Sequence, residues 1–147
     1  MPDVRFIWLG SINLWLIPRK IRDLVLYNHP ENVEFPGYFK GAVFQGAMSG
    51  SDAFFFPSYE ETEGIVVLEA LASGQHVVLR DIPVYNGWID EESAELCHNV
   101  DEFVESLRKV LDGKVDKREA GYRVAESRSI DDVALQLVKA YQTVLEM

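Results

Sequence analysis

The chain has 147 residues, of which 24 are Asp or Glu and 14 are Lys or Arg, so its formal net charge at pH 7 is −10. This negative balance argues against binding along a nucleic-acid backbone, which requires clustered positive charge. The single cysteine, Cys97, excludes an intramolecular disulfide framework and is typical of a reducing compartment, so we expect a cytoplasmic location.

The length is that of one ordinary domain, and residues 1–147 are expected to form a single domain. No basic leader opens the chain. The longest apolar segment, residues 6–17, holds about a dozen residues, whereas a membrane-spanning helix needs ~20. The sequence therefore predicts neither a secretory signal nor a transmembrane helix, while contact with a membrane surface stays open.

Strand and helix patterns alternate along most of the chain. The first half predicts strands at residues 4–9, 32–35 and 52–57, and helices at residues 19–28 and 40–51. The second half predicts strands at residues 76–80 and 93–97, and helices at residues 64–73, between Asn99 and Asp112, at residues 119–126, and from Ser129 onward. This alternation favours an α/β fold, a parallel sheet with helices on both faces.

Three local patterns carry more specific expectations. Asn99 and Glu102 have the spacing of a capping box before an amphipathic helix. The apolar residues 14–17 form a loop that either packs under its own helix or meets another domain or a membrane interface. The last helix carries an apolar stripe made of Val133, Leu137, Tyr141 and Val144.

Residues 56–70 join a predicted buried strand to a helix and concentrate polar chemistry. The loop carries Glu60, Glu61 and Glu63, and Gly64 follows directly before the helix. In open α/β sheets ligands bind at this edge, and unpaired amides at the start of a helix form a site for phosphate oxygens. Glu69 lies among apolar residues of the helix, where a carboxylate is costly unless it is paired or binds a ligand.

This segment resembles the E-x7-E signature of the family 4 retaining glycosyltransferases, which have the GT-B fold. Glu61 and Glu69 match the two acids of the signature. Three further markers stand in the family's order: a Pro-Asp-Val strand that ends at Gly10, the Asn-Val-Glu-Phe-Pro-Gly segment at residues 32–37, and the Ser-Asp-Ala to Pro-Ser segment at residues 51–58. Residues 54–73 and 81–85 are most similar to bacterial diacylglycerol glucosyltransferases.

The resemblance implies that the chain is the C-terminal, Rossmann-like half of a GT-B enzyme, which binds the nucleotide-sugar donor. It implies that Glu69 accepts hydrogen bonds from the two ribose hydroxyls and that Glu61, as the catalytic acid, holds hydroxyls of the transferred sugar. The expected donor is UDP-glucose. The expected acceptor is a lipid such as diacylglycerol, which would bring the enzyme to the inner face of the membrane.

The resemblance also implies where the rest of the donor binds. Gly64 and the amides of Ile65 and Val66 would hold the diphosphate, and the turn at Gly37 and Tyr38 would lie against the nucleobase. Enzymes of this family typically need no metal, so we expect no metal and no other cofactor. Their main electrostatic task is to stabilise the departing diphosphate.

The chain departs from the family at its front. In the family, a β-α unit with an Arg and a Lys that clamp the diphosphate, and before it an acceptor-binding N-terminal domain, precede the segment matching residues 2–10. We therefore expect an N-terminally truncated half whose partner is that domain. The absent strand would lie between the strands at residues 4–9 and 53–57. Because unpaired edges invite pairing, either these strands close directly or two copies of the chain pair through the gap. We expect direct closure, with some self-association through residues 14–17.

Other functions stay open at this point. One alternative is the same enzyme class with a polysaccharide or lipopolysaccharide acceptor. Another is a non-catalytic nucleotide-sugar-binding or interaction module, which the absent clamp residues favour and the presence of Glu61, Gly64 and Glu69 disfavours. A magnesium site made by Glu60, Glu61 and Glu63 is a third. The histidines share no metal-ligand spacing.

Overall fold

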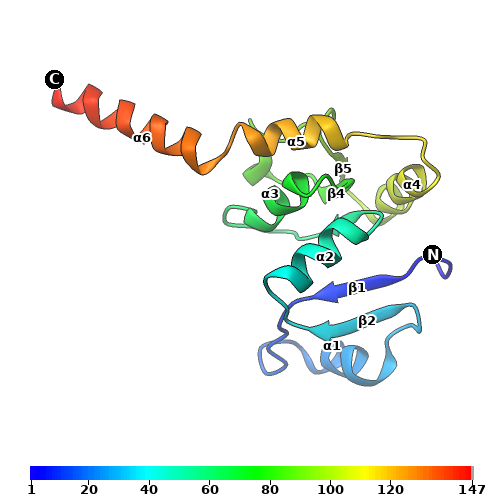
Figure 1. Cartoon of the computed structure of the whole chain (residues 1–147). Helices are drawn as coiled ribbons and strands as arrows, with labels where there is room; N and C mark the ends of the chain where they lie inside the picture. The colour runs from blue at the N-terminus through cyan, green and yellow to red at the C-terminus, as the bar shows by residue number, and fades with distance from the viewer. Residues whose placement is uncertain (147) are drawn as a thin grey trace. The chain divides into compact units, whose positions relative to one another are not determined.

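The computed structural model describes residues 1–146. The chain forms two compact units, Met1–Ala47 and the residues from Met48 onward, and each unit has its own parallel sheet (Figure 1).

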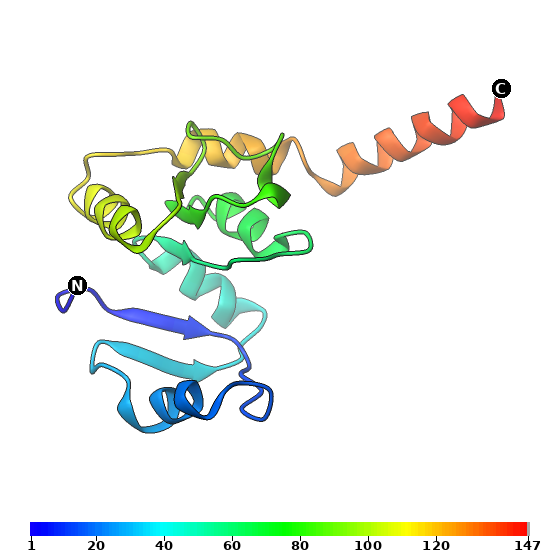
Figure 2. The same cartoon turned by 180° about the vertical axis from the view of Figure 1, so that it is seen from behind.

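The first unit is built on the parallel strands β1 (Phe6–Leu9) and β2 (Val33–Gly37) (Figure 2). The side-chain amide of Asn32 donates hydrogen bonds to the carbonyls of Met1 and Val4, at 3.0 and 2.6 Å, and so fastens the starts of the two strands together. The strands are connected by α1 (Arg19–Asp23), which continues into the π-helical turn η1 (Leu24–Asn28). The two predicted strands are confirmed, and the predicted helix at residues 19–28 is half α-helical and half π-helical.

The second unit contains a parallel sheet in the order β3-β4-β5. Its strands are β3 (Phe54–Phe56), β4 (Val77–Arg80) and β5 (Glu95–Cys97). The central strand β4 is the apolar middle of the unit, because Val77, Val78 and Leu79 are all buried. The predicted strands at residues 76–80 and 93–97 are confirmed. The strand at residues 52–57 is also present, but its side chains are only partly buried, although the apolar run predicted cover on both faces.

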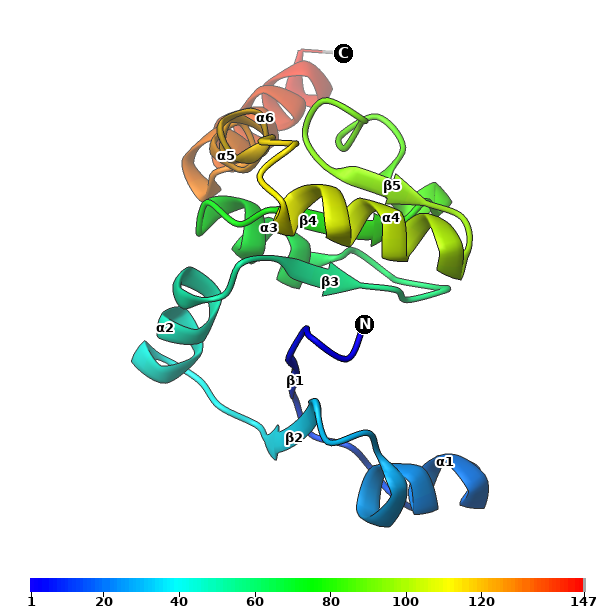
Figure 3. The ribbon, with the colours of Figure 1, turned by 90° about the vertical axis from the view of Figure 1, so that its right-hand side faces the viewer.

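Helices flank this sheet on both sides, as predicted. α2 (Ala42–Gly50) runs from the first unit into the second and leads to β3. α3 and α4 lie on opposite sides of the sheet, and α5 packs against α3 (Figures 1 and 3). The remaining bounds are α3 (Ile65–Ala72), the 3-10 turn η2 (Pro83–Tyr85), α4 (Val100–Leu111), α5 (Arg118–Glu126) and α6 (Ile130–Leu145).

The predicted helix caps are present. The Asn99 side chain accepts from the amide of Glu102 at 3.0 Å, as the capping box predicts. The Glu102 carboxylate reaches back to the amide of His98, at 2.7 Å, one residue before the N-cap amide of an ideal box. Ser129 accepts from the amide of Asp132 at 3.2 Å and begins α6. Gly74, with a φ of 68°, follows α3 in the left-handed conformation that ends many helices.

The expected closure of the sheet is wrong. Within residues 1–146, β1 pairs only with β2 and β3 pairs only with β4, so the two strands belong to separate sheets. The expectation assumed that an open strand edge would bury unpaired backbone groups. Ile7 and Trp8 of β1 are instead about half exposed, and β3 is only partly buried, so neither strand is enclosed as that expectation assumed.

Two apolar segments lie open to solvent. Trp15 and Leu16 are 89% and 81% exposed, which excludes the alternative in which these two side chains pack under their own helix. No side chain of α6, from Ile130 to Leu145, is buried, so its apolar stripe is also uncovered. Within the described residues, no helix has the length and apolar composition to cross a membrane.

Candidate functional site

The start of α3 presents free backbone amides. Gly64 precedes the helix with φ 77° and ψ 34°, a left-handed conformation that favours glycine. The Gly64 carbonyl accepts from the amides of Val67 and Leu68 at 2.9 and 3.3 Å, which begins the helical ladder. The amides of Ile65 and Val66 lie in the first turn and have no carbonyl within the helix to donate to, and Gly64 has no side chain to cap them. This end of the helix therefore attracts an anion.

An aromatic pair packs against Gly64. A Cβ atom added to Gly64 would lie 3.0 Å from Cε1 of Tyr85 and 3.8 Å from Cζ2 of Trp88, so the position is closed to a side chain. The two rings meet edge to face with centroids 5.6 Å apart. The Trp88 indole donates to the carbonyl of Val84 at 2.7 Å, and the Arg128 guanidinium lies 4.7 Å from the centre of the indole. These contacts hold the glycine turn in place.

Glu61 lies in the loop before Gly64 and is half-buried. Its charge acts on the phenol of Tyr85, whose side chain is 2% exposed. Burial, and secondarily the charge of Glu61, raise the pKa of Tyr85 to about 12. Within residues 1–146, the Tyr85 hydroxyl has no hydrogen-bond partner.

Arg80, at the end of β4, fastens the loop that carries Glu61. Its Nε donates to the carbonyl of Pro57 at 3.1 Å, and its Nη1 donates to the carbonyl of His98 at 2.9 Å. The guanidinium also lies 3.9 Å from the centre of the Tyr59 ring, within the range of a cation–π contact. The loop between β3 and α3 is thereby tied to the central strand of the sheet.

Glu69 lies one turn into α3, on the side of the helix that Ile65 also occupies. Its side chain is exposed, so the carboxylate keeps its hydration. The apolar sequence around Glu69 suggested a free-energy cost of burying this charge, but an exposed carboxylate does not incur that cost. Its backbone carbonyl accepts from the Ser73 hydroxyl at 2.7 Å. The carboxylate is open to a ligand at the surface of the helix.

The remaining two predicted site residues lie in the first unit. Gly37 ends β2 with a φ of 100°, and its carbonyl accepts from the amide of Gly10 at 3.0 Å. Tyr38 follows it with an exposed side chain. Glu61, Gly64, Ile65, Val66 and Glu69 are thus brought together on one loop and helix of the second unit, whereas Gly37 and Tyr38 form a turn of the other unit.

The magnesium alternative receives no support. Among the described residues, no three His, Cys, Asp or Glu side chains are grouped so that they could hold a metal ion. Glu60 and Glu63, which that alternative requires beside Glu61, are both exposed loop residues.

Sequence reasoning missed three residues that shape the site: Arg80, Tyr85 and Trp88. All three lie at or just beyond the end of β4. Their place in the sequence, at or after the end of a predicted strand, could have indicated a role in the site. Residues that follow the carboxyl ends of neighbouring parallel strands meet at the same edge of a sheet.

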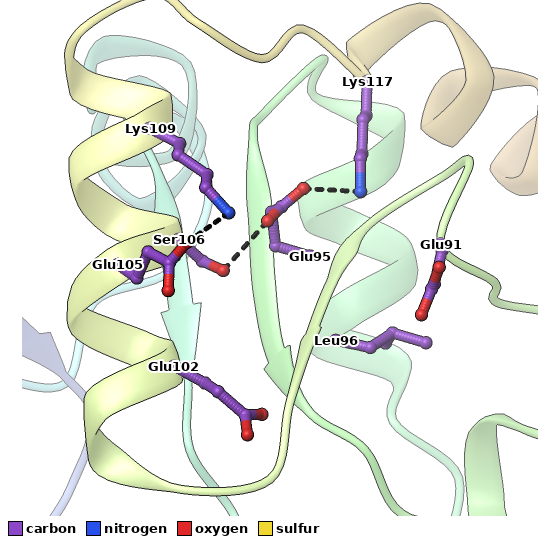
Figure 4. Close-up of a pocket in the computed structure, with 8 residues that line it drawn as sticks. All are labelled: Glu91, Glu95, Leu96, Glu102, Glu105, Ser106, Lys109 and Lys117. Carbon is purple, nitrogen blue, oxygen red and sulfur yellow. Dashed lines mark hydrogen bonds and ion pairs between the residues drawn. The ribbon is translucent and has the colours of Figure 1, made fainter.

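A polar pocket of about 320 Å³ lies between β5 and α4 (Figure 4). The Lys117 ammonium is 2.5 Å from the Glu95 carboxylate, which also accepts from the Ser106 hydroxyl at 2.9 Å. Burial raises the pKa of Glu95, but the hydrogen bonds from Lys117 and Ser106 outweigh it and the net pKa is lowered. The Glu95 carboxylate is hydrogen-bonded to both partners, so we interpret this cluster as a network that stabilises the fold. Its lining residues are Glu91, Glu95, Leu96, Glu102, Glu105, Ser106, Lys109 and Lys117.

Residues 21–127 match the family described as glycosyl transferases group 1. A processive diacylglycerol alpha-glucosyltransferase from Acholeplasma laidlawii is 47% identical over 149 aligned residues, which cover 100% of this chain and 45% of that protein. An alpha-galactosylglucosyldiacylglycerol synthase from Streptococcus pneumoniae is 28% identical over 87 residues, which cover 58% of this chain and 23% of that protein. The chain therefore spans less than half the length of these curated relatives.

A solved structure shares the fold. The crystal structure of the pneumococcal O-GlcNAc transferase GtfA, in complex with UDP and GlcNAc, superposes with a TM-score of 0.68 and 16% sequence identity. The match covers 87% of this chain and 28% of that one. The likeness confirms the predicted fold class, a Rossmann-like part of a GT-B architecture.

Proposed function

The chain belongs to the glycosyl transferases group 1 family, and from this premise we propose that it is the half of a retaining glycosyltransferase that binds the nucleotide-sugar donor. The observation that carries the proposal is the start of α3. There, free amides behind a left-handed glycine lie between two acids, Glu61 and Glu69, at the spacing of the family's signature. Residues 1–147 would act as one donor-binding domain composed of the two units.

The α3 amides would bind the diphosphate of the donor. Ile65 and Val66 offer N–H donors at the positive end of the helix dipole, and Gly64 lets the backbone come close. As the bond between sugar and diphosphate breaks, negative charge grows on the departing phosphate. Donors that are already aimed at that position stabilise the charge without having to reorganise.

The two acids would bind the two sugars of the donor. Glu69 would accept hydrogen bonds from both ribose hydroxyls, since its exposed carboxylate has the acceptor capacity for both. Glu61 would hold hydroxyls of the transferred sugar from the loop that Arg80 fastens. Gly37 and Tyr38 would lie against the nucleobase. No metal enters this proposal.

We further propose that the donor is UDP-glucose and the acceptor a lipid such as diacylglycerol. The support is the 47% identity to a diacylglycerol glucosyltransferase along the whole chain. Transfer would take place at the inner face of the membrane, with the acceptor held by an N-terminal domain corresponding to the part of that relative outside the match. A polysaccharide or lipopolysaccharide acceptor is the alternative for the same site.

The test is calorimetric titration of the chain with UDP, beside Glu69→Ala and a control, Glu126→Ala, which removes an exposed acid near the end of α5. We expect weak binding of UDP to the wild type and to the control. Glu69→Ala should bind UDP about tenfold or more weakly, because hydrogen bonds to a charged group contribute about 1.5–3 kcal/mol and 1.4 kcal/mol is tenfold.

Two results would count against the proposal in different ways. A wild-type chain that binds no UDP would remove the donor-binding function. Equal UDP affinity for wild type and Glu69→Ala would leave donor binding intact but disprove the ribose role of Glu69.

A further inference from the structure

The Tyr85 hydroxyl is buried without a partner. The side chain is 2% exposed, and within residues 1–146 no polar atom forms a hydrogen bond with its oxygen. A buried hydroxyl that has lost its water and gained no hydrogen bond lowers stability. Because almost all buried polar groups in folded proteins are hydrogen-bonded, such an exception requires an explanation.

The packing of the ring does not explain the hydroxyl. Tyr85 fills the space under Gly64 with its ring edge and meets Trp88 edge to face. A phenylalanine at this position would make the same contacts. The oxygen atom is therefore not needed to build the floor of the glycine turn.

The chemistry of the nearby groups indicates which of them can form a hydrogen bond with the Tyr85 hydroxyl. The oxygen lies 3.7 Å from the point where a Gly64 Cβ would stand, directly beneath the start of α3. A phenol oxygen can also accept, but the first amides of α3 are the donors given above to the diphosphate, and the Trp88 indole already donates to Val84. Glu61 stands half-buried in the same loop, three residues before the Gly64 that Tyr85 contacts, and its charge contributes to the raised pKa of Tyr85. Its carboxylate is an acceptor.

We propose that Tyr85 is a positioning residue whose hydroxyl donates a hydrogen bond to the Glu61 carboxylate in the donor-bound state, and so fixes Glu61 against the hydroxyls of the transferred sugar. This rests on the proposed function, because it deepens the role given there to Glu61. A tyrosine phenol is protonated at neutral pH, and burial raises the pKa of Tyr85 further, to about 12, so its hydroxyl can donate.

The experiment compares the affinities of UDP-glucose and UDP for the 147-residue chain by calorimetry, so that the ratio isolates the sugar. The variants are Tyr85→Phe, Glu61→Ala and both together, because alanine leaves no acceptor for the hydroxyl. We expect each single variant to lower UDP-glucose affinity about threefold or more while UDP affinity stays within about twofold. The double variant should bind UDP-glucose no more weakly than Glu61→Ala, because the two residues act as one unit.

A matched control and a stability measurement separate this role from a structural one. Tyr122→Phe removes a hydroxyl from an exposed tyrosine of α5 and should change neither affinity. Tyr85→Phe should unfold at or above the wild-type temperature, since it removes an unsatisfied buried group.

Four results would overturn the proposal. They are a lower unfolding temperature for Tyr85→Phe, an equal loss of UDP and UDP-glucose affinity in that variant, fully multiplicative losses in the double variant, or a wild type in which the sugar adds no affinity. A wild type that binds no UDP at all would instead refute the proposed function, and this inference with it.

Discussion

Glu95 and Lys117 form a largely shielded ion pair in the second unit. Their side chains are 13% and 23% exposed, and the Lys117 ammonium also donates to the Ala94 carbonyl at 2.9 Å. The pair therefore ties the segment before α5 to β5 and, through Ser106, to α4. In a shielded pair of this kind, removing one partner is more costly than the pair's own net contribution, because the other charge is left desolvated.

We predict that Lys117→Met destabilises the protein by about 1.5–3 kcal/mol at pH 7, since a shielded carboxylate loses a charged hydrogen bond. The lowered pKa of Glu95 means that its contribution is fully present above the unfolded pKa of about 4.5 and is lost as pH falls through the folded value. The difference in unfolding free energy between wild type and variant should therefore shrink below about pH 4.5 in urea titrations followed by circular dichroism.

Lys114→Met is the control, because Lys114 pairs with Asp112 at an exposed position. It should change stability far less than Lys117→Met. Equal effects of the two substitutions, or a Lys117→Met effect that does not change with pH, would show that Glu95 does not depend on this partner.

At the scale of residues, the sequence predicted a site residue whose signal is a local backbone pattern. It missed residues that shape the site through contacts with distant parts of the chain. Gly64 was predictable, because a glycine before a helix with nearby acids is a local pattern. Tyr85 and Arg80 were not, because their importance comes from contacts with Gly64 and Pro57, more than 20 positions away along the chain. Glu69 was expected to lie in an apolar environment, but its side chain is exposed, so the apolar sequence around it was a poor guide to its burial.

At the scale of elements, α3 and α5 pack closely against each other. A Cβ atom on Gly121 of α5 would lie 2.6 Å from Cδ2 of Leu71 and 3.1 Å from the carbonyl oxygen of Ser93. Leu71 is fully buried in α3, and the Ser93 contact is backbone, so neither neighbour can move away freely. The glycine lets the two helices approach each other.

We predict that Gly121→Ala lowers the unfolding free energy by about 1–3 kcal/mol, the usual cost of overpacking. The control is Gly46→Ala in α2, where, apart from the chain neighbours and the helix's own backbone, no atom of the described residues lies within 4 Å of the new Cβ. It should be neutral or stabilising by about 0.5–1 kcal/mol, because alanine favours a helix. Urea unfolding measures both variants. A Gly121→Ala protein as stable as the wild type would show that the helices can separate without cost.

The elements themselves were largely predictable, since each has a local signal. The capping box placed the start of α4, and the apolar run of residues 76–80 placed β4. The π-helical half of the helix at residues 19–28 had no such signal, because apolar spacing over a single turn is too short a pattern to tell i to i+4 from i to i+5 hydrogen bonding. The partial exposure of β3 was missed because an apolar run does not reveal what covers it.

At the scale of the whole chain, the division of the strands into two separate sheets could not be predicted from the sequence. Strand pairing depends on contacts between distant segments, and only resemblance to the family could suggest a missing strand between β1 and β3. The apolar faces of α6 and of residues 14–17 were predictable as patterns, but their exposure was not.

We predict that the 147-residue chain binds donor but transfers no sugar. Transfer requires the acceptor to be held in line with the donor, and positioning can supply about 7–11 kcal/mol of the barrier. The chain spans only 45% of its glucosyltransferase relative, so we expect the acceptor-binding part to lie outside it. The measurement is incorporation of radiolabelled glucose from UDP-glucose into diacylglycerol vesicles. The Acholeplasma enzyme in the same vesicles is the control, and turnover by the chain alone would contradict the prediction.

The burial of Cys97 also makes the protein convenient for site-specific labelling. It is the only cysteine in the sequence, its side chain is fully buried, and burial raises the pKa of its thiol, so the reactive thiolate is scarce at neutral pH. A cysteine introduced at Thr62, which is exposed in the loop beside Glu61, would therefore react selectively with a maleimide dye or spin label. The native sequence thus offers a background on which motions of that loop can be followed without first removing a thiol.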